Sequence, residues 1–313
     1  MLDLIQPGLL ERFAGLRGRF VCAQPFRHVV IDDFLAPEFC RQLLSEFPQF
    51  DERHALNERG EVGGKAVHHN LAQLGPAYTR LDRMLRSREF LDFIGGIADI
   101  PDLLYDPEYI GGGTHENRDG QDLDPHVDFN YHPKSQLHRR LNLIVFLNPE
   151  WDPAWGGSLE LHLNPWLPGE QNRFETVVPV MNRCVLFETT ENSWHGFRKI
   201  VFPPDKKHLS RRSIAVYFYT RGRPAAEQAT SHGTFYVPWG LPEHIRAGHT
   251  LSQEDVASIR LLLDRRDTHL RFLYERELEF MSALSAIIKS RAFRLSRMVL
   301  WPLRKIRDLQ RRI

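Results

Sequence analysis

Between about Leu103 and Tyr219, the chain consists of short β-forming runs separated by Gly, Pro and Asn. Runs of this length with turn residues between them are typical of antiparallel sandwiches and barrels. The expected strands cover residues 109–113, 125–129, 141–147, 158–163, 175–180, 183–188 and 212–219. This pattern constrains the fold more than any other feature, because it predicts a core made of antiparallel strands.

Helical patterns lie on both sides of this region. They cover residues 4–20, 37–47 and 71–100, the last in two pieces broken around Gly95 and Gly96, with a short strand at 26–31. Ser252 followed by Asp255 resembles a capping box that opens a C-terminal helix. We therefore predict a mainly β protein with flanking helices (α+β). Its core is a double-stranded β-helix, or jelly roll, buttressed by N-terminal helices and followed by a C-terminal helical extension.

The expected domain organisation follows these changes in pattern. Residues 1–102 form an N-terminal support region of helices and a strand, residues 103–224 the catalytic core, and residues 225–313 the helical extension. Within the first region, residues 51–67 are polar and rich in Gly. We expect a mobile loop there, of the kind that covers active sites.

Composition narrows the classes of partner. The chain has 41 Lys and Arg against 40 Asp and Glu, so its bulk charge points to no nucleic acid and no general membrane affinity. Cys22, Cys40 and Cys184 are too widely spaced for a disulfide framework or a zinc knuckle, which favours the reducing cytoplasm. The first residues lack the pattern of a secretory signal, and we expect no transmembrane segment.

His126 and Asp128 are the strongest candidates for chemistry. Side chains two residues apart on a strand point to the same face, so both can enter the core of the barrel. His195, on a distant strand, would supply the third ligand of a facial triad of two His and one carboxylate, as non-haem Fe(II) uses. An H-x-D tripeptide by itself is a weak signal, and a surface His/Asp pair is the competing interpretation.

Arg211 and Arg212 are the candidates for an anion anchor. A guanidinium beyond the last metal ligand can hold the carboxylate of a co-substrate by two parallel hydrogen bonds. On a strand the two side chains point to opposite faces, and Arg211 is in phase with Ser213. The competing interpretation of Arg212 is a solvent-facing charge.

Taken in order, these motifs resemble the Fe(II)- and 2-oxoglutarate-dependent oxygenases, in the prolyl 4-hydroxylase-like branch. The matching segments are residues 109–113, 126–128, 140–151, 156–161, 178–179, 183–187, 193–196 and 211–214. The resemblance implies that His126, Asp128 and His195 are the metal ligands and catalytic residues. It implies that Arg211 and Ser213 bind the co-substrate 2-oxoglutarate. It also implies that Fe(II) is the metal, that O₂ is the oxidant and that ascorbate is a supporting reductant.

One position departs from the pattern of that family. Several relatives place a Tyr hydroxyl on the strand after the H-x-D pair, where this chain has Phe146. Asn142, in phase with Phe146, is one candidate for the missing donor to 2-oxoglutarate. Tyr109 and Tyr131 are the other candidates for this role.

The resemblance implies a dioxygenase that hydroxylates an unactivated C–H bond and releases succinate and CO₂. Its substrate would be a peptidyl residue, with proline as one candidate, or a small metabolite. The alternatives are a cupin-like metal-dependent hydrolase or isomerase and a non-catalytic jelly-roll scaffold. Arg211 argues against the hydrolase or isomerase, which would not need this residue. The intact set of three ligands argues against the scaffold, because binding alone does not require them. In residues 289–313, Arg and Lys are interleaved with apolar residues, a pattern that predicts a basic amphipathic helix. We expect this helix to dock on the domain, on a second subunit or on an anionic membrane surface.

Overall fold

The computed structural model describes residues 2–51, 66–167, 170–242, 244–291 and 293. Most of the loop expected at residues 51–67 and of the basic helix expected at residues 289–313 lies outside these ranges. The chain divides into two compact units, Met1–Val237 and Pro238–Ile313. No helix within the described ranges combines the length and the apolar character needed to cross a bilayer.

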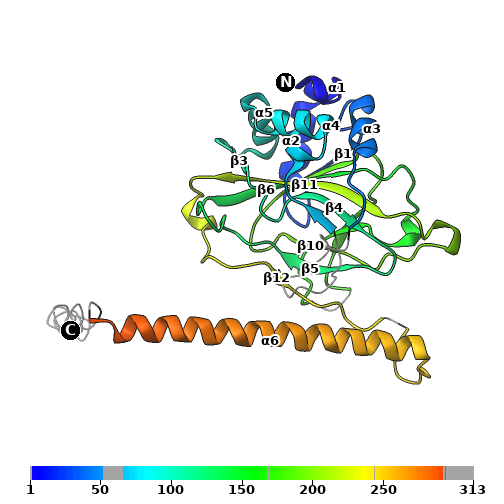
Figure 1. The fold of residues 1–313 in the computed structure, drawn as a ribbon, viewed down its shortest axis with the longest axis vertical. Helices are drawn as coiled ribbons and strands as arrows, with labels where there is room; N and C mark the ends of the chain where they lie inside the picture. Colours follow the sequence, from blue (N-terminus) through cyan, green and yellow to red (C-terminus); the bar gives the residue numbers. More distant parts are fainter. Residues whose placement is uncertain (1, 52–65, 168–169, 243, 292, 294–313) are drawn as a thin grey trace. The chain divides into compact units, whose positions relative to one another are not determined.

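The first unit begins with helices and continues with strands (Figure 1). Its α-helices are α1 (Gly8–Glu11), α2 (Phe13–Cys22), α3 (Pro37–Ser45), α4 (Pro76–Leu85) and α5 (Arg88–Ala98). Its strands are β1 (His28–Ile31), β2 (Ala66–His68), β3 (Leu104–Tyr105), β4 (Gly113–Asn117), β5 (Leu123–Val127), β6 (His138–Phe146), β7 (Leu159–His162), β8 (Phe174–Val177), β9 (Cys184–Glu188), β10 (Trp194–Phe197), β11 (Arg211–Thr220) and β12 (Phe235–Tyr236). Short 3₁₀ turns lie at Leu2–Leu4, Leu71–Gln73, Pro153–Trp155, Pro204–Lys206 and Ala225–Glu227.

The described strands form two antiparallel sheets. The seven-stranded sheet has the order β1-β9-β6-β11-β4-β2, with β3 also paired to β11. The five-stranded sheet has the order β12-β5-β10-β7-β8. Most neighbouring strands in each sheet are not consecutive in sequence, as in a jelly roll, and β7 and β8 are the exception. This arrangement confirms the predicted double-stranded β-helix with flanking helices.

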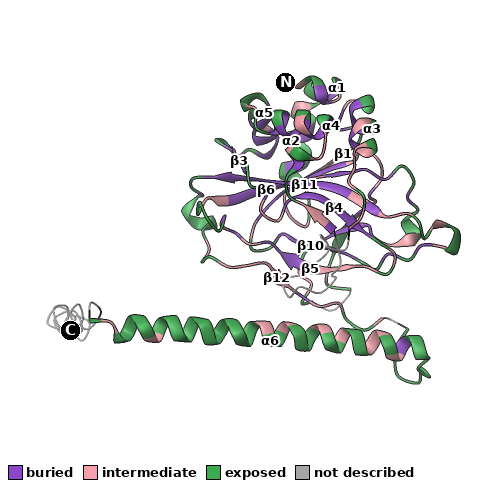
Figure 2. Ribbon diagram, viewed as in Figure 1, coloured by how far each residue is buried: buried purple, intermediate pink, exposed green. Residues whose placement is uncertain are grey.

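Successive side chains of the central strands point alternately toward the helices and toward the space between the two sheets. Leu141, Leu143 and Val145 of β6 belong to the large apolar cluster that the helices cover. Figure 1 shows α1–α5 gathered on that outer face of the larger sheet, and Figure 2 shows that the strands beneath them are buried. The intervening positions of β6 and β11 point between the two sheets, where Phe146, Phe187 and Leu161 belong to a second apolar cluster. Polar residues at these inward positions therefore face an enclosed interior.

Two local predictions were wrong. The helix break expected at Gly95 and Gly96 lies instead before Ser87, whose hydroxyl caps α5 by accepting from the Phe90 N–H. Gly96 lies inside α5, where a Cβ would lie 2.8 Å from the ring of Phe13, so this glycine allows close packing of the helix and does not break it. Residues 109–113, expected as a strand, form a turn up to the start of β4, because Tyr109 has a φ of +49°.

The second unit contains α6 (Gln253–Lys289), a helix of 37 residues. The predicted capping box is present, since Ser252 and Asp255 exchange hydrogen bonds at its start. The boundary at Val237 differs from the expected one at residue 224, because residues 225–237 belong to the first unit and provide β12.

Candidate metal centre

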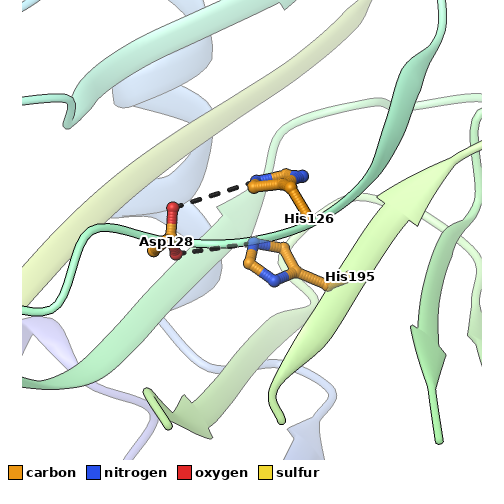
Figure 3. A group of neighbouring side chains, drawn as sticks. All are labelled: His126, Asp128 and His195. Atoms are coloured by element: carbon orange, nitrogen blue, oxygen red, sulfur yellow. Dashed lines mark ion pairs between the residues drawn. The ribbon is translucent and has the colours of Figure 1, made fainter. Parts of the chain in front are cut away.

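Two neighbouring strands of the smaller sheet bring the three expected ligands together. His126 of β5 lies opposite His195 of β10 in the antiparallel register, and Asp128 follows directly after β5. The ligand atoms of the three side chains all lie within 4.8 Å of one another. Asp128 Oδ1 is 3.8 Å from His126 Nε2, and its Oδ2 is 3.6 Å from His195 Nε2 (Figure 3). Three donors from three directions thus surround one point.

Backbone carbonyls orient both imidazoles. His126 Nδ1 is 2.9 Å from the carbonyl oxygen of Asp124, and His195 Nδ1 is 2.9 Å from that of Ser193. A carbonyl can only accept, so each Nδ1 carries the proton and each Nε2 is left as a donor atom for a metal. Burial lowers the pKa of His195, which favours the neutral imidazole that a metal requires.

The carboxylate of Asp128 is held in place from the other side. Arg139 Nη2 donates to Asp128 Oδ2 at 2.9 Å, and Asn142 Nδ2 donates to the same oxygen at 2.7 Å. Burial alone would raise the pKa of Asp128, but the charge of Arg139 and the hydrogen bond from Asn142 help to hold it well below its usual range. Asp128 is therefore an anion with a fixed orientation, and Oδ1 is turned toward His126.

Arg139 is a functional residue that sequence reasoning missed. Its side chain is fully buried, and its guanidinium lies over the ring of Tyr217, with 3.4 Å from Cζ to the ring centroid. Simple alternation along β6 would place Arg139 with Leu141, on the face toward the helices. A register shift opposite Phe218 and Tyr219 turns Arg139 to the interior instead. The sequence signal that could have found it is the pair of adjacent arginines at the start of a core strand.

Arg211 and Ser213 also face the interior, as their spacing predicts. Ser213 lies opposite Phe146 in the β11–β6 register, and both are buried. The guanidinium of Arg211 lies over the rings of Phe146 and Phe197, with its Cζ 5.0 Å and 4.3 Å from their centroids. Phe197 is two positions after His195 on β10, so Arg211 lies on the same side of that strand as the ligand.

Arg212 points the other way. Its Nε is 3.3 Å from Glu116 Oε1 and donates to Ser210 Oγ at 3.1 Å. Its side chain is 37% exposed. The geometry thus separates the two arginines into one buried and one surface cation.

Arg211 has no acidic partner among the described residues. Its Nε donates to the carbonyl of Gly157 at 2.7 Å, and burial lowers the pKa of the guanidinium to about 9. A buried cation without an anion is costly unless a ligand supplies the negative charge. The residues therefore fit a dicarboxylate such as 2-oxoglutarate, just as two imidazoles and a carboxylate fit Fe(II).

The other two residues expected to bind the co-substrate have different surroundings. Asn142 donates to Asp128, while its Oδ1 accepts from Arg139 Nε at 3.0 Å. The hydroxyl of Tyr109 donates to Asp82 Oδ1 at 3.0 Å, inside the apolar cluster beneath the helices. Asn142 thus holds the carboxylate of Asp128, and Tyr109 forms its hydrogen bond within the core. Their expected role in binding the co-substrate stays a prediction.

A segment after β11 lies against the strand that carries the first ligand. Tyr236 of β12 pairs with His126 of β5, and their ring centroids are 5.0 Å apart. Asn130 holds the same segment, since its side chain donates to Thr230 O at 2.9 Å and accepts from His232 N at 3.0 Å. Sequence reasoning missed this contact because a strand of two residues has no recognisable periodicity.

Residues 112–219, which contain all three ligands and both arginines, match the family model described as the 2OG-Fe(II) oxygenase superfamily. This segment is a 2OG-Fe(II) oxygenase domain. Fe(II) and 2-oxoglutarate are accordingly its metal and co-substrate, and O₂ is the oxidant that the reaction implies. The resemblance expected from the sequence is confirmed.

Among curated proteins, the chain is similar to mouse Prolyl 3-hydroxylase OGFOD1. The two are 28% identical over 163 residues, which is 46% of this chain and 27% of the mouse protein. The chain therefore spans about a quarter of the length of that relative. This similarity agrees with the prolyl 4-hydroxylase-like branch that the sequence motifs resemble.

Solved structures with similar folds include other oxygenases. A Trichoplax adhaerens prolyl hydroxylase in complex with a hypoxia inducible factor peptide matches with a TM-score of 0.47 and 14% identity, covering 70% of this chain and 96% of that one. A Pseudomonas putida prolyl-4-hydroxylase matches with a TM-score of 0.47 and 17% identity, covering 67% and 100%. HygX from Streptomyces hygroscopicus, with nickel, 2-oxoglutarate and hygromycin B bound, matches with a TM-score of 0.43 and 14% identity, covering 66% and 91%.

Proposed function

We propose that this protein is an Fe(II)- and 2-oxoglutarate-dependent dioxygenase that hydroxylates an unactivated C–H bond. The observation that carries this proposal is the convergence of His126, Asp128 and His195 in an interior that also holds the buried cation of Arg211. When bound, the metal and co-substrate supply the oxidising chemistry, which consumes O₂ and releases succinate and CO₂.

The residues of the chain supply binding and orientation. His126, Asp128 and His195 hold the metal through Nε2, a carboxylate oxygen and Nε2. Arg211 binds the distal carboxylate of 2-oxoglutarate by a charge-assisted pairing, and the hydroxyl of Ser213 assists it. The apolar walls around Arg211 exclude water, which strengthens that pairing.

For the substrate, we favour a peptidyl residue, with proline as the first candidate. Support comes from the mouse relative, whose name identifies it as a prolyl 3-hydroxylase. A small metabolite is the second candidate, because a shared fold transfers substrate identity poorly. A cupin-like hydrolase or isomerase would have no use for the buried Arg211, and a binding scaffold would have no use for three converging ligands.

Succinate release tests the reaction. The purified chain with Fe(II), ascorbate and 2-oxoglutarate should produce succinate slowly without substrate. His126→Ala and His195→Ala should each abolish this release and weaken Co(II) binding while circular dichroism stays unchanged. If His195→Ala keeps both wild-type metal affinity and turnover, His195 is not a ligand. Incubation with prolyl peptides and with metabolite mixtures, read by the mass of one added oxygen atom, identifies the substrate class.

Two further expectations belong to the same proposal. A cytoplasmic location is supported by Cys22, Cys40 and Cys184, which are all free thiols. Fractionation of cells that express a tagged chain tests it. The basic segment 289–313 is expected to dock on the domain, on a second subunit or on an anionic membrane. Co-sedimentation with acidic vesicles, with and without that segment, tests the membrane alternative.

A further inference from the structure

The helix α6 has an apolar surface that its own unit leaves exposed. Figure 2 shows α6 as exposed along most of its length. Phe280 is 67% exposed, Leu270 63%, Ile287 57% and Leu263 55%. A helix in a protein derives most of its stability from the packing of its apolar side. We therefore expect that another element covers the exposed apolar side chains of this 37-residue helix.

Eight of the apolar residues of α6 lie on a heptad repeat, while others, such as Leu261, Leu278 and Met281, lie outside it. Alternating steps of three and four residues connect positions 256, 259, 263, 266, 270, 273, 277, 280, 284 and 287. These are the a and d positions of a coiled coil, which form the contact between two helices. Eight of the ten are Val, Ile, Leu or Phe, and the other two are Arg266 and Glu277. We call these ten positions the seam of α6.

The two charged residues determine which partner fits the seam. In a parallel pair of identical helices each position meets itself, so Arg266 would face Arg266 and Glu277 would face Glu277. In an antiparallel pair each a position meets a d position, and Arg266 can face Glu277 of the other helix. Like charges in an interface are unfavourable and opposite charges favourable, so an antiparallel pair is preferred.

The antiparallel register that pairs Arg266 with Glu277 also pairs the rest of the seam. Leu270 then meets Leu273, and Leu263 meets Phe280. Towards the ends, Ile259 meets Leu284 and Val256 meets Ile287. Each pair lies symmetrically about the point between residues 271 and 272, within one residue of the middle of α6 (Gln253–Lys289). The register that pairs Arg266 with Glu277 therefore aligns the two helices over their full length.

We propose that α6 binds α6 of a second copy of this chain as an antiparallel two-stranded coiled coil. The contact would extend over about 55 Å, the length of a 37-residue helix. Arg266 and Glu277 meet twice, once on each side of the two-fold axis, and specify the orientation. A contact of this kind is isologous, so it closes at the dimer and does not propagate.

Charge substitutions within the seam test this pairing in the full-length chain. Arg266→Glu places two acidic residues opposite each other in both charged layers, and Glu277→Arg places two basic ones. Sedimentation equilibrium should show a dimer for the parent chain. Each single substitution should raise the dimer dissociation constant by at least about tenfold, and the double substitution Arg266→Glu/Glu277→Arg should restore it.

Matched substitutions outside the seam control for net charge. Arg271→Glu and Glu275→Arg make the same changes on exposed positions of α6 and should leave the dimer intact. A parallel coil has like charges in both layers before and after each substitution, so equal effects of the single and double variants would overturn the proposal. A chain that stays monomeric, because α6 packs on its own catalytic domain or binds acidic vesicles, would also overturn it.

Discussion

The guanidinium of Arg139 and the carboxylate of Asp128 form a buried ion pair, with 2.9 Å between Nη2 and Oδ2. In the proposed metal centre, Arg139 is thus a positioning residue that acts through a ligand. Arg211 lies in the same interior without an acidic partner among the described residues. The two buried arginines are therefore expected to respond in opposite ways when their charge is removed.

Arg139→Met should destabilise the metal-free protein by about 3–5 kcal/mol, because it leaves the Asp128 carboxylate buried without its cation. Chemical denaturation measures this change in the free energy of unfolding. Addition of Co(II) should recover part of the loss, since the metal replaces the missing positive charge. Equal stability of the parent and variant proteins without metal would show that the ion pair contributes nothing.

Arg211→Met should keep or increase the stability of the ligand-free protein, because it removes a buried charge that has no partner. The same variant should bind 2-oxoglutarate at least about 100-fold more weakly, since two charge-assisted hydrogen bonds are lost. Calorimetric titration with Co(II) present measures this affinity. Arg212→Met, the matched control on the opposite face, should bind like the parent. Weakened binding in Arg212→Met alone would assign the anchor to that residue.

Gly196→Ala should weaken the metal centre without touching the metal. A Cβ at this position would lie 2.6 Å from the carbonyl oxygen of Leu123, so β10 and β5 would have to separate. His195 and His126 lie on these strands, and we expect the affinity for Co(II) to fall by about 10- to 100-fold. Gly222→Ala is the control, because a Cβ there meets nothing within 4 Å. Unchanged Co(II) affinity in Gly196→Ala would mean that the strands accommodate the methyl group.

A single thiol should react in the folded protein. Cys22 is exposed, whereas burial raises the pKa of Cys40 to about 12 and that of Cys184 well above 9.0. Colorimetric titration at pH 8 should count one thiol in the folded protein and three in denaturant.

The same pKa shifts give a direction for stability against pH. The two buried thiols keep their protons in the folded state, while the unfolded chain loses them near pH 9.0. Folding stability should therefore fall as the pH rises above about 9. Replacing Cys40 and Cys184 with Ala should remove this part of the pH dependence, and an unchanged slope would assign it to other groups.

The sequence by itself determined the features that depend on spacing along one strand. Side chains alternate between the two faces of a strand, so the positions of His126 and Asp128 on one face, and of Arg211 and Arg212 on opposite faces, follow from the order of residues. Turn residues between the β runs indicated the antiparallel core, and the ordered motifs indicated the family. The Ser252 cap could also be predicted, because a capping box involves neighbouring residues only.

The tertiary structure decided the features that break this regularity or join distant segments. A register shift in β6 turns Arg139 inward, although alternation would place it with Leu141 under the helices. Asn142 and Tyr109 have polar atoms engaged by Asp128 and Asp82, partners that only the folded chain brings near. Periodicity gives the face on which a side chain lies, but bulges and long-range hydrogen bonds are set by the packing of whole sheets.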